Sequence, residues 1–201
     1  MTHPQFSAEE RRAQIVATAT CLFAKNGFAG TTTAALAKVC GVSEALIYKH
    51  FSSKRSLYEA IVTAKLKTRE PFEVDLETED SVEEVLTRLS IQVYALVEDD
   101  PDFVRLLYYS ELQGSEVARL FQAARGPTAL ESLAGFLQRG IDRGDLRGGL
   151  DPKLLAANFF CLAWHSATSL KVFERELIYP PTEDAPAIQT IVSIFARGLR
   201  P

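Results

Sequence analysis

The sequence predicts an all-α protein of about nine helices, with a three-helix helix-turn-helix head in residues 1–68 and a helical body in residues 69–201. Apolar residues recur with the spacing of an amphipathic helix along nearly the whole chain. Glycine and proline stand between the periodic segments, where helices are expected to begin and end. We recognise no pair of alternating segments that would form strands.

The first helix is expected from Ser7 to Asn26. Ser7 and Glu10 have the spacing of a capping box, and Gly27 follows the last turn as a helix stop. The apolar stripe of this helix recurs at i, i+4, i+7 and i+8, through Ile15, Ala19, Leu22 and Phe23.

Two short helices follow, joined by the turn Gly41-Val42-Ser43, and a fourth opens at Ser52-Ser53 with Leu57, Ile61 and Ala64 on one face. Thr31 or Thr32 caps the first of the pair, and Ser43 caps the second, which runs from Glu44 to Phe51. Glycine suits a three-residue turn, where the backbone bends sharply, and Val42 and Ile47 supply the apolar plug. The pair therefore matches a helix-turn-helix motif.

The body begins with an acidic connection over residues 70–80. A helix then starts at Ser81 and Glu84, a buried one follows Pro101, and Gly126-Pro127 opens another. After a turn over residues 144–149, Asp151-Pro152 starts a long helix to about Ile178. A last helix carries Ile188, Ile191, Val192, Phe195 and Leu199.

The charge of the chain is divided unevenly along its length. The formal net charge is −4, yet residues 1–68 hold nine Lys/Arg against four Asp/Glu, and the rest holds 13 against 22. A basic head on an acidic body is suited to presenting one end to phosphates. The start of the chain lacks the features of a signal peptide, and no run approaches the ~18 apolar residues of a membrane span. We expect a cytoplasmic protein with reduced cysteines at Cys21, Cys40 and Cys161.

The second helix of the motif carries side chains suited to the major groove, which is ~12 Å wide. Tyr48, Lys49 and His50 can reach phosphates or base edges, and Lys54 lies near a helix start that attracts anions. The candidate residues for contact with double-stranded DNA are Thr31, Thr32, Thr33, Ser43, Glu44, Ala45, Tyr48, Lys49, His50 and Lys54.

The head resembles that of the TetR family of transcriptional regulators. The resemblance rests on Leu22-Phe23-Ala24-Lys25-Asn26-Gly27-Phe28, Thr31-Thr32, Leu36-Ala37, Gly41-Val42-Ser43 and Ile47-Tyr48-Lys49-His50-Phe51-Ser52-Ser53-Lys54-Arg55-Ser56-Leu57. It implies that Tyr48, His50 and Lys54 contact the DNA backbone or adjacent bases. It also implies a homodimer through the last two helices and a ligand cavity in the body. Glu44 and Leu46 depart from the basic or small polar residues of many members.

From this resemblance we expect a repressor that a small apolar or amphipathic effector releases from a palindromic operator. Two heads on a two-fold axis, spaced by about one helical turn or a multiple of it, demand such symmetry of the site. Candidate pocket residues are Tyr108, Tyr109, Phe136, Trp164 and His165, although aromatic residues at helical spacing also occur in ordinary cores.

Three alternatives stay open at this point: an activator, a DNA-binding factor of the same fold without an effector, such as an architectural or cell-division factor, and an enzyme. Cys161 and His165, four residues apart, offer a thiolate–imidazole pair, but we find no orienting third group beside them. We expect no catalytic residue, metal site or cofactor, since no motif for one is recognised.

Overall fold

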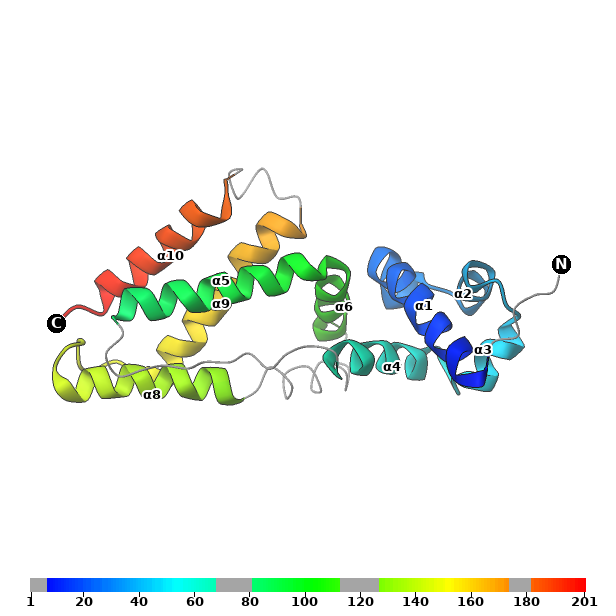
Figure 1. Ribbon diagram of the computed structural model, residues 1–201, viewed down its shortest axis with the longest axis horizontal. Coiled ribbons are helices and arrows are strands. Elements are labelled where there is room, and N and C mark those ends of the chain that lie inside the picture. The colour runs from blue at the N-terminus through cyan, green and yellow to red at the C-terminus, as the bar shows by residue number, and fades with distance from the viewer. Residues whose placement is uncertain (1–6, 68–80, 113–126, 174–181) are drawn as a thin grey trace. The chain divides into compact units, whose positions relative to one another are not determined.

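The computed structural model describes residues 7–67, 81–112, 127–173 and 182–201. Nine α-helices lie in these ranges, which confirms the all-helical prediction. None of them is long and apolar enough to cross a membrane. Their bounds are α1 Ala8–Gly30, α2 Thr33–Cys40, α3 Glu44–His50, α4 Lys54–Lys67, α5 Val82–Asp99, α6 Pro101–Leu112, α8 Pro127–Arg143, α9 Pro152–Lys171 and α10 Asp184–Gly198 (Figure 1).

The chain divides into two compact units that are interleaved along the sequence. The first unit is residues 1–69 with 102–124, and the second is residues 70–101 with 125–201. Helices α1 to α4 therefore belong with nearly all of α6, and the second unit contains α5, α8, α9 and α10. Below, the first unit is called the head unit and the second the body unit.

Most of the expected helix ends are present. Ser7 and Ser81 each form a capping box, with Glu10 and Glu84 respectively. Gly27 breaks the regular backbone of α1 with φ 70° and ψ 173°, and one further turn follows it. Helix α9 ends at Lys171 instead of near residue 178, because the amides of residues 172 and 173 both donate to the carbonyl of Thr168. The expected acidic connection over residues 70–80 lies outside the described residues.

An aromatic cluster forms part of the core of the head unit. The Tyr58 ring meets the rings of Phe23 and Phe28 edge-on, with centroids 5.2 and 5.4 Å apart. The Tyr58 hydroxyl donates to the carbonyl of Leu106 over 2.5 Å, which ties α4 to α6. The other large buried side chains of the motif region include Ile15, Leu36, Ile47, Leu57 and Ile61.

The body unit is organised around α9, which packs against α5, α8 and α10, while α10 also packs along α5 (Figure 1). Phe159 of α9 is buried and meets Phe195 of α10 edge-on, with ring centroids 5.5 Å apart. The Tyr94 and Ser166 hydroxyls share a hydrogen bond of 2.6 Å between α5 and α9. The interior of this unit is therefore apolar with a few hydroxyl groups.

Candidate nucleic-acid interface

The two helices of the motif meet at a tight turn whose geometry only a few residues adopt readily. Gly41 has φ 65° and ψ 33°, in the left-handed region, and its amide donates back to the last turn of α2. Ser43 then caps α3, with the Leu46 amide donating to its hydroxyl over 3.2 Å. Because α3 has only seven residues, it depends on this cap and on the buried Ile47 more than on its own helix propensity.

Helix α3 presents an exposed face bearing several of the predicted DNA-contacting residues. The Tyr48 side chain is 49% exposed, and its hydroxyl lies 3.2 Å from the Thr33 hydroxyl at the start of α2. This hydrogen bond joins the exposed face of α3 to the N-terminus of α2. The exposed predicted residues on and beside α3 are Ser43, Glu44, Ala45, Tyr48 and Lys49, whereas His50 is half-buried.

The three threonines before α2 occupy different environments. Thr32 is exposed and caps α2, accepting the Ala35 amide over 3.1 Å, and Thr33 is half-buried. Thr31 must be corrected as a candidate contact, because its side chain is completely buried. Its hydroxyl donates to the carbonyl of Gly27 over 2.8 Å, so it stabilises the connection between α1 and α2.

Lys54 also has partners inside the head unit. Its ammonium donates to the carbonyls of Phe28 and Thr31 over 2.8 and 2.9 Å. The same ammonium lies 4.3 Å from the centroid of the Phe28 ring, a cation–π distance. The sequence placed this lysine at a helix start but gave no sign of these acceptors, which lie 26 and 23 residues earlier.

Arg12 is a cation that sequence reasoning missed. Its guanidinium carbon lies 4.8 Å above the ring of Phe51, the residue that ends α3. Arg12 therefore adds a positive charge beside the motif. The pair Arg11-Arg12 was visible in the sequence, but its proximity to Phe51 depends on how α1 packs.

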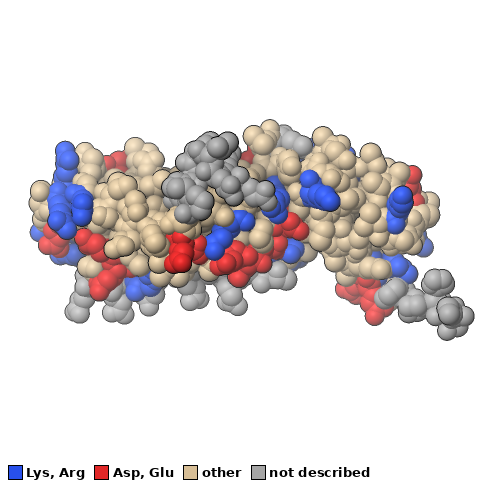
Figure 2. Space-filling model, turned by 90° about the horizontal axis from the view of Figure 1, so that it is seen from above, with Lys and Arg blue, Asp and Glu red and all other residues tan. Residues whose placement is uncertain are grey.

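The charges of the two units differ on the surface as they do along the sequence. Figure 2 shows Lys and Arg over both units on the face in view: over α1 to α4 they stand singly among uncharged residues, and most of the Asp and Glu lie nearer the body unit. An exposed cationic surface is what attraction to a phosphate backbone requires.

The five predicted pocket residues are distributed over both units. Tyr108 and Tyr109 lie half-buried on α6 in the head unit, and the Tyr109 ring packs against Gly27. In the body unit, Phe136 is buried, Trp164 is half-buried and His165 is exposed. Phe136 borders a small depression with Leu146 and Arg200, of about 430 Å³.

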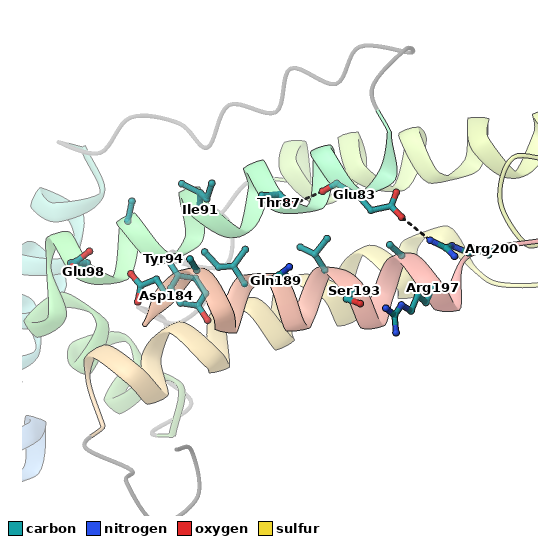
Figure 3. Close-up of a pocket in the computed structure, with 15 residues that line it drawn as sticks. Glu83, Thr87, Ile91, Tyr94, Glu98, Asp184, Gln189, Ser193, Arg197 and Arg200 are labelled. Atoms are coloured by element: carbon teal, nitrogen blue, oxygen red, sulfur yellow. Dashed lines mark hydrogen bonds and ion pairs between the residues drawn. The ribbon is translucent and has the colours of Figure 1, made fainter. Parts of the chain in front are cut away.

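A larger groove of about 710 Å³ runs between α5 and α10 in the body unit (Figure 3). Tyr94, Ile188 and Val192 are buried residues of its lining. At one end the Lys171 ammonium lies 3.1 Å from Glu98 and 2.9 Å from Asp184, and the hydrogen bond to Asp184 raises the pKa of Lys171.

The opposite end of this groove is more basic. Arg197 and Arg200 both lie there, with Glu83 3.8 Å from Arg200 (Figure 3). The lining therefore mixes apolar side chains such as Ile188 and Val192 with polar ones, and it carries two guanidinium groups at one end. Sequence reasoning did not find this groove, because its walls lie about 100 residues apart in the chain.

Comparisons with known proteins agree with this geometry. The family model for bacterial regulatory proteins of the tetR family matches residues 15–61. The nucleoid occlusion factor SlmA of Marinobacter nauticus is 31% identical over 148 residues, which cover 73% of this chain and 74% of that protein. This chain belongs to the TetR family. The HTH-type transcriptional regulator TtgR of Pseudomonas putida is 29% identical over 160 residues, 76% of each chain.

Solved structures share the TetR-family fold. AibR, in complex with isovaleryl coenzyme A and operator DNA, matches with a TM-score of 0.67 at 21% identity, covering 92% of this chain and 97% of that one. FadR from Bacillus subtilis, in complex with stearoyl-CoA, matches with a TM-score of 0.63 at 21% identity, covering 92% and 98%.

As a TetR-family member, this chain is a DNA-binding transcriptional regulator and not an enzyme. The hypothesis of a Cys161–His165 catalytic pair is therefore set aside. Both residues are exposed on α9, and Cys21 is exposed as well. Cys40 is buried at the end of α2, and burial raises the pKa of its thiol.

Proposed function

We propose that this regulator is a cytoplasmic repressor that binds a palindromic operator as a homodimer and leaves it when a small molecule binds. The observation that carries the proposal is the exposed face of α3, whose Tyr48 is held by Thr33 at the start of α2. We infer that α3 enters the major groove and that the start of α2 contacts phosphate.

The proposed DNA contacts come from the exposed and half-buried members of the predicted set. Tyr48, Lys49 and His50 are assigned to phosphates or base edges near the groove, and Thr32 and Thr33 to the adjacent backbone. Ser43, Glu44 and Ala45 lie on the same exposed surface and are assigned as neighbours of the bases. Glu44 would accept only from a base donor such as the cytosine amino group, which limits the sequences that it tolerates.

An apolar exposed stripe supports the proposed dimer. On α9, Leu154 is 63% exposed and Leu162 is 39% exposed, and on α10 Ile194 is 61% exposed. Asn158, Cys161 and His165 lie on the same exposed side of α9 at helical spacing and add polar groups to it. Large apolar side chains gathered on two neighbouring helices favour burial against a second copy. We therefore assign His165 to this face and not to the effector pocket.

The groove between α5 and α10 supports an amphipathic effector. Its volume of about 710 Å³ falls in the range of small-molecule sites, roughly 300–1,000 Å³. An apolar effector portion would cover Ile188 and Val192, and an anionic group would lie at Arg197 and Arg200. The ligands of AibR and FadR, acyl coenzyme A molecules, combine the same two chemical properties.

A second candidate function is favoured by a different observation. The similarity to the nucleoid occlusion factor SlmA covers about three quarters of both chains. A DNA-binding factor without a small-molecule effector would share the head unit and the dimer. The two candidates differ only in whether a small molecule releases the DNA.

Selection of random DNA duplexes by the purified protein tests the proposed function. We expect the recovered sequences to share an inverted repeat with half-sites about 34–36 Å apart or a multiple of that spacing. Recovery of no preferred sequence, or of an asymmetric one, would contradict a homodimeric operator binder.

A release assay on the recovered duplex then separates the two candidates. We expect at least one compound from a panel of apolar and amphipathic metabolites to lower DNA affinity, and Arg197→Ala to weaken that response for anionic compounds. Constant affinity across the panel favours the factor without an effector. Transcription in vitro from a promoter that carries the site distinguishes repression from activation.

A further inference from the structure

We infer that Lys54 acts as a positioning residue, which caps the C-terminal end of α1 from a distance and thereby holds α2 and α3 in place for DNA. The inference rests on the proposed DNA-binding function of the head unit. It assigns Lys54 a role within the protein, in place of the phosphate contact that its position at the start of α4 suggests.

The C-terminal end of α1 needs such a group. The last carbonyls of a helix have no partner within it, and the helix dipole places partial negative charge there. The last turn of α1 carries no basic side chain of its own. Lys54 supplies the charge from α4, donating to the carbonyl of Phe28 in that turn and to that of Thr31, the residue that ends the helix.

The segment that Lys54 contacts contains a backbone conformation that is unfavourable for most residues. Gly27 leaves the helical conformation with φ 70°, and only three residues separate it from Thr31. The Thr31 hydroxyl donates to the Gly27 carbonyl, and the Phe28 ring lies under the Lys54 ammonium. Hydrogen bonds and ring contact together fix the path of this short connection.

The path of the connection decides where the DNA-facing groups lie. Thr32, directly after Thr31, caps α2, and Thr33 is hydrogen-bonded to Tyr48 of α3. A shift of the Thr31 carbonyl therefore moves the start of α2 and the support of Tyr48 together. Two of the three ammonium hydrogens of Lys54 are committed to this task and the charge lies over a ring, which leaves little of the group for phosphate.

The salt dependence of DNA binding tests this inference. Removing a lysine that contacts phosphate flattens the slope of log Kobs against log salt concentration by about one unit. We expect Lys54→Met to weaken binding to the selected duplex at least about tenfold, because loss of the charge-assisted hydrogen bonds displaces α2 and α3. The slope should stay unchanged, because no phosphate contact is removed. Lys49→Met, at an exposed lysine on α3, is the matched control and should flatten the slope.

Hydrogen exchange of the protein without DNA gives a second readout, which does not depend on whether an operator is recovered. In Lys54→Met we expect faster amide exchange over residues 28–36 and unchanged exchange over residues 55–62. Lys54→Arg keeps donors for both carbonyls and should restore the slow exchange and most of the affinity.

The opposite pattern would overturn the inference. A slope flattened by one unit in Lys54→Met, with exchange over residues 28–36 unchanged, would assign Lys54 to phosphate. Unchanged DNA affinity in Lys54→Met would show that the hydrogen bonds of Lys54 are not needed to position α2 and α3 for binding. If the methionine variant does not fold, Lys54→Gln retains an uncharged NH2 donor group, and the same slope comparison decides.

Discussion

At the scale of single residues, Gly27 has the clearest effect on the backbone of the head unit. Its φ of 70° and ψ of 173° lie in a region that essentially only glycine adopts. A Cβ placed there would lie 3.0 Å from Cε1 of Tyr109, closer than ordinary van der Waals contact. Both the backbone and the neighbouring ring therefore require a glycine at this position.

Gly27→Ala should lower the free energy of unfolding by about 2–4 kcal/mol, since backbone strain of about 1–3 kcal/mol adds to displacement of the Tyr109 ring. Urea denaturation of both proteins measures the difference. Gly30→Ala is the control, because a Cβ there meets only Asn26, at 3.6 Å, and φ is not positive. We expect the control to change stability by less than about 1 kcal/mol. Equal effects at the two positions would refute the argument from strain.

At the scale of whole elements, helix ends explain most of the secondary structure. The N-terminus of α5 illustrates this: the Ser81 hydroxyl accepts the Glu84 amide over 3.2 Å, and the Glu84 carboxylate accepts the Ser81 amide over 2.9 Å. Both partners are exposed, so the box stabilises the helix end without burial. Such caps connect a local sequence pattern directly to a helix boundary.

Ser81→Ala should lower the free energy of unfolding by about 1 kcal/mol, since one N-cap hydrogen bond is lost. Thermal unfolding followed by circular dichroism provides the measurement. Ser81→Asp keeps a capping oxygen and should retain most of the stability. A melting temperature unchanged in the alanine variant would show that α5 does not depend on its cap.

For the molecule as a whole, the proposed dimer face is the feature with the largest consequences. Ile194 and Leu154 are more than half exposed on two neighbouring helices of the body unit. A single head contacts too few base pairs for useful specificity, so DNA binding depends on joining two copies. In the proposed dimer, the same surface would therefore control both oligomeric state and operator affinity.

Ile194→Glu should shift the protein toward monomer, because dimerisation would bury an unpaired charge at a cost of about 3–5 kcal/mol. Sedimentation velocity measures the oligomeric state, and operator affinity should fall in parallel. Ile91→Glu on α5 is the matched control, since Ile91 is 55% exposed but lies outside α9 and α10. A dimer that persists in Ile194→Glu and dissociates in Ile91→Glu would place the interface elsewhere.

The sequence by itself determined the helices, the motif and the family, because caps, glycine stops and apolar periodicity act within a few residues of one another. Ser7, Thr32, Gly41 and Ser43 each occupy the local position that their residue type predicts. The exposed face of α3 followed from the same local pattern. Those parts of the candidate site could be predicted.

The tertiary structure alone decided which polar groups are used inside the protein. Whether Thr31 and Lys54 face solvent or the end of α1 depends on how α4 packs against α1, a contact between residues more than 20 positions apart. The groove between α5 and α10 likewise exists only once two distant helices lie together. Periodicity states which side of a helix is apolar, but the partner that covers it is selected by packing of the whole chain.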